Sequence, residues 1–114
     1  MTKHFITIFT LLALSLPAHA NSSFGTHTVK RIIIHDSGNI IIGFSGSDVH
    51  SESCTEKSSY MLVNDHPHFD QMYAGLLAAL HSGATVKGWV NGCVAWWGRT
   101  STKITRLDFH SAQP

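Results

Sequence analysis

One amphipathic helix between strand-like segments constrains the fold of this chain more than any other feature. Apolar side chains recur at helical spacing between Asp65 and Gly83, and they form one face: Phe69, Met72, Tyr73, Leu76, Leu77 and Leu80. Asp65 or His66 can cap the start, with Pro67 in the first turn. Gly83 can adopt the left-handed conformation that ends a helix. We therefore predict one helix within this stretch.

The segments on both sides of the helix are typical of β-strands. Strands are predicted at residues 29–35, 40–45, 58–63, 84–91 and 103–110. Residues 21–28 are expected to form a loose arm, and residues 46–56 and 92–102 are expected to form loops. The order β-β-β-α-β-β matches the five-stranded Greek-key barrel of the OB type. We therefore predict a mainly β fold with one helix, built by residues 21–114 as a single domain.

The first twenty residues have the pattern of a secretory signal. Lys3 and His4 precede an apolar run at 5–16, and small residues at 18 and 20 favour cleavage before Asn21. The run is too short to cross a bilayer as a helix, so no membrane insertion is expected. We predict a secreted or periplasmic protein.

Cys54 and Cys93 are the two cysteines of the chain. Export favours a disulfide between them, and two free thiols or a metal pair are the alternatives. In an OB-type barrel the end of the fourth strand and the start of the third lie at the same end. The positions of both cysteines are compatible with a bridge there.

Charge and motifs exclude several functions. Without Lys3, seven basic and seven acidic side chains remain, and no basic stripe is present. A nucleic-acid partner is therefore not expected. The chain has no nucleophile elbow, no H-E-x-x-H motif and no glycine-rich phosphate loop. We predict a non-enzymatic protein without a cofactor.

The sequence HPHFD places His66 and His68 near Asp70. An H-x-H pair can contribute to a zinc or copper site, but no third ligand stands at a diagnostic spacing. We therefore predict that these residues cap the helix start and that no metal site is present.

Three tryptophans lie close together in the sequence: Trp89, Trp96 and Trp97. Trp96 and Trp97 fall in a glycine-flanked segment with Arg99 beside them. Exposed indole rings can stack on sugar rings, and an arginine can fix the hydroxyl groups. One hypothesis is a glycan- or partner-binding loop formed by Trp96, Trp97 and Arg99. The alternative is that Trp96 and Trp97 fold back over a small core next to the disulfide. Trp89 is expected to be buried or to pack on the barrel surface.

The helix face opposite the leucines carries no charge, and its residues are Gln71, Gly75, Ala78 and Ser82. A glycine in a helix interior costs about 1 kcal/mol relative to alanine, so another interaction should compensate for it. One hypothesis is that this face packs against a neighbouring subunit, and the alternative is a neutral solvated surface. The consecutive isoleucines at 32–34 and 40–42 also predict that both faces of the first hairpin are covered, one of them by a neighbouring subunit.

A loose pattern from Cys54 onward resembles the cell-binding B subunits of subtilase-cytotoxin-like and pertussis-like toxins. It consists of C-x-x-K-S-S followed by a helix that ends L-x-x-x-x-S-G-x-x-V, and its residues here are Cys54, Lys57, Ser58, Ser59, Leu77, Ser82, Gly83 and Val86. This chain is shorter than those subunits, and its N-terminal part does not align with them.

The resemblance implies an OB-type barrel in a homo-oligomeric ring, a pentamer as in that family, which binds host-cell glycans and carries a separate enzymatic A subunit. It nominates Lys57, Ser58 and Ser59 as further ligand-binding residues. A periplasmic or secreted protein-binding module or inhibitor that uses the tryptophan loop is the alternative.

Overall fold

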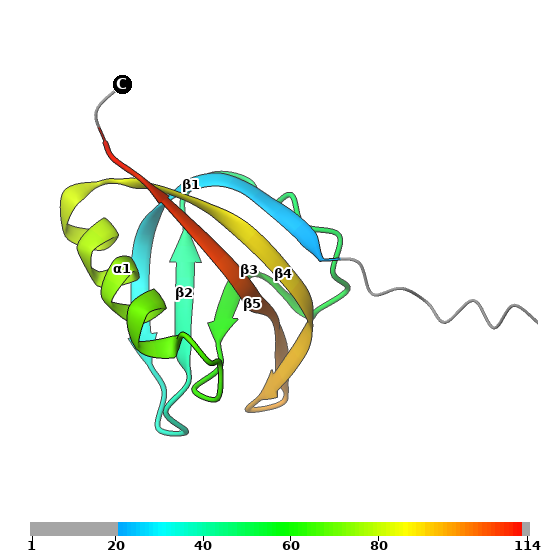
Figure 1. Cartoon of the computed structure of the whole chain (residues 1–114). Coiled ribbons are helices and arrows are strands. Elements are labelled where there is room, and N and C mark those ends of the chain that lie inside the picture. Colours follow the sequence, from blue (N-terminus) through cyan, green and yellow to red (C-terminus); the bar gives the residue numbers. More distant parts are fainter. Residues whose placement is uncertain (1–20, 113–114) are drawn as a thin grey trace, which may run out of the picture.

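The computed structural model describes residues 21–112 and confirms a closed five-stranded β-barrel with one helix (Figure 1). The strands are β1 (Ser22–Ile34), β2 (Ile40–Phe44), β3 (Glu56–Leu62), β4 (Thr85–Trp96) and β5 (Arg99–His110). Helix α1 (Phe69–Ser82) follows β3. The predicted signal at residues 1–20 lies outside the described residues.

The strands follow one another around the barrel in the order β1-β2-β3-β5-β4. Strand β4 pairs with β1 and closes the barrel, and β3 and β5 form the parallel pair. The other pairings are antiparallel. This arrangement is the predicted OB-type order.

Inward-facing side chains of the strands and one face of α1 form a single core. Met72, Leu76 and Ala79 are the buried residues of the helix, and it packs against β1 and β5. The predicted apolar face is therefore confirmed at its centre, whereas Leu77 lies at its half-buried margin. The core consists of Phe24, Val29, Ile40, Ile42, Tyr60, Leu62, Met72, Leu76, Ala79, Val86, Val90 and Ile104.

The two ends of the helix differ in how well the sequence predicts them. Gly83 ends the helix with φ of 73°, and its N–H donates to the Ala79 carbonyl, as expected. The predicted cap at Asp65 or His66 is wrong, because the helix begins at Phe69 after His68, which makes no side-chain cap. The preceding residues instead form tight turns, in which the N–H of Phe69 donates to the carbonyl of His66.

A disulfide joins Cys54 to Cys93, which confirms the predicted bridge. Cys54 lies just before β3, and Cys93 lies in the last part of β4, opposite Thr102 of β5. The bridge therefore ties the long β2–β3 connection to the β4–β5 hairpin.

The expected N-terminal arm is wrong, because residues 22–28 belong to β1 and pair with β4. Phe24 and His27 point inward and are 0% and 8% exposed. A bulge between Ser23 and Thr26, with φ of 79° at Gly25, interrupts the alternation that would have revealed a strand.

The expected loop at 92–102 is also wrong. Strands β4 and β5 continue to a two-residue turn at Trp97 and Gly98, whose φ values are 42° and 74°. Two positive φ values suit a tight hairpin turn that matches the twist of the strands. Figure 1 shows this turn at the same end of the barrel as the β1–β2 turn.

Within residues 21–112, no helix has the length and apolar character needed to cross a membrane.

Candidate functional site

A groove of about 460 Å³ lies on the outer surface of the barrel and brings together two predicted groups of residues. Strand β3 contributes Ser58 and Ser59 of one group, together with Glu56, which was not predicted, and the β4–β5 hairpin contributes the other group, Trp96, Trp97 and Arg99. The parallel pairing of β3 with β5, in which Glu56 stands opposite Ser101, sets them side by side. We call this feature the Trp97 groove.

Trp96 forms a fixed part of the groove wall. Its indole N–H donates to the hydroxyl oxygen of Ser101 over 2.7 Å, and Ser101 is fully buried. The guanidinium carbon of Arg99 lies 5.6 Å from the centre of the Trp96 ring, within the range of a cation–π interaction. The half-buried ring of Trp96 is therefore held by contacts on its edge and near its face.

Trp97 is the most exposed part of the groove. Its exposed fraction is 76%, so the alternative in which both tryptophans fold over the core is wrong for this residue. Among residues 21–112, Trp97 is the one non-glycine residue with a positive φ, a conformation that costs about 1–3 kcal/mol. His35, in the β1–β2 turn, packs edge-on against the indole with ring centres 4.9 Å apart. The turn thus presents a large flat apolar surface at the rim.

The polar groups of the groove come from both sides. Arg99 Nε lies 3.6 Å from Glu56 Oε1, and both side chains are partly exposed. Ser58 is exposed, whereas Ser59 is 7% exposed at the base. Lys57 is exposed but does not line the groove, and its carbonyl accepts a hydrogen bond from Nε2–H of His50 over 2.9 Å.

Sequence reasoning missed the groove residues of the first hairpin. Arg31 and Ile33 of β1 and Ile41 of β2 also line the Trp97 groove. Along β1 and β2 these residues are the direct neighbours of the inward-facing Ile32 and Ile42, so they point to the opposite face of the sheet. Strand alternation was therefore the signal that could have identified them.

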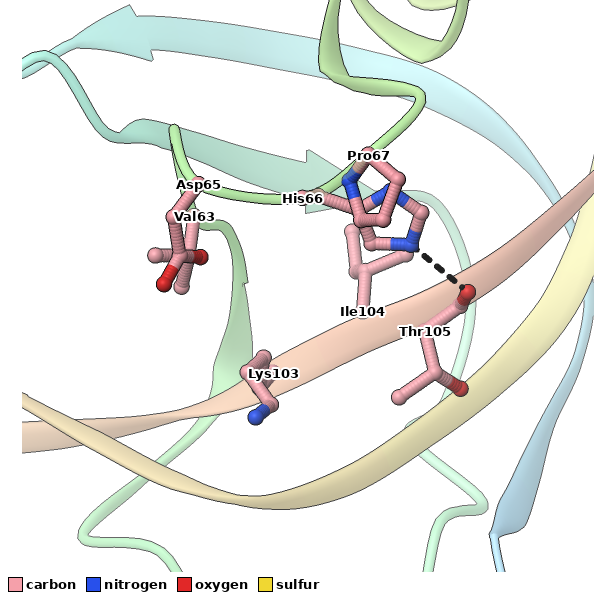
Figure 2. A pocket seen from close by; sticks show the side chains of 7 residues that line it. All are labelled: Val63, Asp65, His66, Pro67, Lys103, Ile104 and Thr105. Carbon is pink, nitrogen blue, oxygen red and sulfur yellow. Dashed lines mark hydrogen bonds between the residues drawn. The ribbon is translucent and has the colours of Figure 1, made fainter.

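The first histidine of HPHFD has a structural partner. Nε2–H of His66 donates to the Thr105 carbonyl over 3.0 Å, inside a pocket of about 200 Å³ between the β3–α1 connection and β5 (Figure 2). Figure 2 shows the imidazole turned toward Thr105, with Pro67 beside it. The rings of His66 and His68 are 6.0 Å apart. No group of three potential metal ligands occurs in the part of the chain that the structure describes.

The uncharged outer face of α1 is largely solvent-accessible, and Gln71, Ala78 and Ser82 are exposed. Gly75 is half-buried, and a Cβ atom at this position would lie 2.4 Å from the Phe109 ring. The C-terminal end of β5, which carries Phe109, therefore explains why residue 75 is a glycine. A contact with a second copy of the chain is not needed to explain it.

No known protein-family model matches this chain, and a comparison with curated proteins gives no match either, so the resemblance to toxin B subunits rests on the quoted residues alone.

Proposed function

We propose that this protein is a non-enzymatic glycan-binding module and that the Trp97 groove holds the sugar. The observation that carries the proposal is the position of Trp97: its indole is 76% exposed at the rim of a groove whose walls supply hydrogen-bonding groups. A sugar ring can place its apolar face on the indole. The serine hydroxyls and the guanidinium of Arg99 can then bond to its hydroxyl groups.

The location of the groove supports the same proposal. OB-type barrels bind oligosaccharides and oligonucleotides over strands two and three and the loops that join strands one to two and four to five. The Trp97 groove occupies this region, with Ile41 from β2, Ser58 from β3 and Trp97 from the β4–β5 turn. The near-balanced charge of the chain favours a sugar over a polyanionic nucleic acid.

A glycan array followed by titration calorimetry tests this function. Trp97→Ala should abolish the array hits or weaken their affinity at least about tenfold, because stacking aromatics dominate such interfaces. Val49→Ala removes another exposed apolar side chain, at 60% exposure in the β2–β3 connection, and should leave the hits unchanged. An array without hits, or hits that survive Trp97→Ala, would refute the proposal, and binding of oligothymidine instead would favour the nucleic-acid use of the fold.

We further propose that the protein acts outside the cytoplasm, secreted or periplasmic, as its leader pattern and its disulfide favour. By its resemblance to toxin B subunits, it would bind host-cell glycans as a homo-oligomeric ring that carries an enzymatic A subunit. The exposed positions Gln71, Ala78 and Ser82 would then supply a contact between copies. A monomeric mass by light scattering at tens of micromolar would rule out the ring.

A protein ligand is the second candidate. Ile33 and Ile34 are 39% and 66% exposed, and Ile33 lies in the same groove as Trp97. Such an apolar surface also suits a protein partner. Affinity capture from periplasmic extract and from host membranes, each with the Trp97→Ala variant as control, separates the two functions.

A further inference from the structure

A second surface of the barrel has the chemistry of a binding site, and it lies apart from the Trp97 groove. Two adjoining hollows of about 290 and 260 Å³ lie over β4 and β5 beside the N-terminal part of β1, and Trp89 and Arg106 line both. The other side chains that the argument uses are Ser23, Lys87 and Asp108. We call this surface the Trp89 hollow.

The backbone fixes the position of Trp89 beside Arg106. These two residues are register partners across the β4–β5 hairpin, and a bulge follows directly after Trp89. A Cβ atom at the neighbouring Gly88 would lie 2.1 Å from the carbonyl oxygen of Arg106, so no other residue fits there without moving the strands. The indole and the guanidinium are therefore set on one surface by the fold itself.

The same pair of residue types occurs twice on this hairpin. Trp96 stands opposite Arg99, as Trp89 stands opposite Arg106. At the first pair the arginine lies near the indole face. At the second pair Arg106 turns to Asp108, with Nε 2.9 Å from Oδ1, and Trp89 keeps 36% of its surface exposed. The second indole thus remains open to a ligand.

The charge of the hollow favours an anion. Asp108 pairs with Arg106, and Lys87 makes no ion pair within residues 21–112, which leaves one cation in excess. The guanidinium has further N–H donors besides Nε, and its planar arrangement suits a carboxylate. Ser23, the register partner of Trp89 on β1, places a hydroxyl group at the opposite edge.

We propose that the Trp89 hollow is a second saccharide site and that it takes a sugar ring bearing a carboxylate. The ring lies on the indole of Trp89, and the carboxylate bonds to Arg106 and Lys87. This assignment uses none of the residues of the Trp97 groove, so it stands whether or not the groove binds glycans.

Titration calorimetry on the full chain with a matched pair of probes tests the site. The probes are cellotriose and the trisaccharide of β-1,4-linked glucuronate, which differ in the carboxylates. The glucuronate trimer should bind at least about tenfold more tightly than cellotriose, and the difference should shrink as sodium chloride rises from 0.05 to 0.5 M. Equal affinities for the two probes, or no binding of the glucuronate trimer, would overturn the proposal.

Two variants locate the binding. Arg106→Gln should weaken binding of the glucuronate trimer about tenfold, and Trp89→Ala should weaken it at least as much. Lys103→Gln removes one positive charge from an exposed position of β5 outside the hollow, and it should leave the affinity within about twofold. Urea unfolding midpoints verify that each variant is folded. Binding that is lost on Trp97→Ala but retained in Arg106→Gln would assign the probe to the Trp97 groove and refute the second site.

Discussion

Replacing Gly75 by alanine should fail to stabilise this protein, although the same replacement stabilises an ordinary helix. An alanine in a helix interior gains about 1 kcal/mol over glycine. Here the new Cβ atom would lie 2.4 Å from Cε2 and 2.5 Å from Cζ of Phe109. Carbon atoms pack at about 3.5–4.0 Å, so the ring must move and lose part of its packing against α1.

The size of this loss follows from the burial of the ring. Phe109 is 39% exposed, so about three-fifths of its surface is covered. Full burial of a phenylalanine is worth about 1.5–3 kcal/mol, so displacing the ring costs at most about 1–2 kcal/mol. Gly75→Ala should therefore leave the free energy of unfolding unchanged or lower it by about 1 kcal/mol. In the Phe109→Ala background it should raise that energy by about 1 kcal/mol, because no ring is displaced.

Urea unfolding of the wild type, both single variants and the double variant measures the coupling energy between the two positions, which should be about 1–2 kcal/mol. Ala78→Gly, at an exposed position of the same helix, calibrates the intrinsic preference and should cost about 1 kcal/mol. Stabilisation by Gly75→Ala in both backgrounds would refute the reasoning. An effect of Gly75→Ala that grows with protein concentration would instead place a second copy of the chain on this face.

Three further predictions concern the frame around the groove. Replacing Cys54 and Cys93 together by alanine should lower the free energy of unfolding by about 4 kcal/mol in the chain-entropy model, because the bridged residues are 39 positions apart. Urea unfolding measures this loss, and reducing the disulfide of the wild type should give the same value. Burial, and then a hydrogen bond to a carboxylate, raise the pKa of Tyr60 well above its ordinary value. The stability that protonated Tyr60 contributes is therefore complete below about pH 10 and declines above it. Tyr60→Phe should flatten the fall of the urea midpoint between about pH 9 and 11. An unchanged slope in this variant would show that the fall does not come from titration of Tyr60. Ser101→Ala should cost about 1–3 kcal/mol by leaving the Trp96 N–H without its acceptor, and the cost should vanish in a Trp96→Phe background.

Residue patterns predict the fold well because local and global signals agree. The apolar face of the helix, its end at Gly83 and the β-branched strands all favour one arrangement, and the cysteine pair is consistent with it. The strand predictions fail where one residue shifts the alternation of a strand. Gly25 marks such a bulge in β1, and further bulges near Trp89 and before Cys93 disturb β4.

The groove could be predicted only in separate pieces. Ser58 and Trp97 each attract attention in the sequence, but the parallel pairing of β3 with β5 brings them together, and this pairing depends on barrel closure. The turn at Trp97 was missed because a tryptophan rarely adopts a positive φ. Its neighbour Gly98 was the available signal, since a glycine favours such turns.

The isoleucine pattern of the first hairpin predicted a neighbouring subunit, but the chain covers part of that face itself. Ile41 lies outside the core cluster, yet it is 1% exposed at the base of the Trp97 groove, and its register partner Met61 is also 1% exposed. Ile33 and Trp97 remain open in the same groove. A ligand in the groove and a subunit on this hairpin would therefore compete for one surface. If the groove binds glycans and a ring forms through another face, saturating ligand should leave the mass measured by light scattering unchanged. Dissociation of the ring by the ligand would instead identify the hairpin face as the contact between copies.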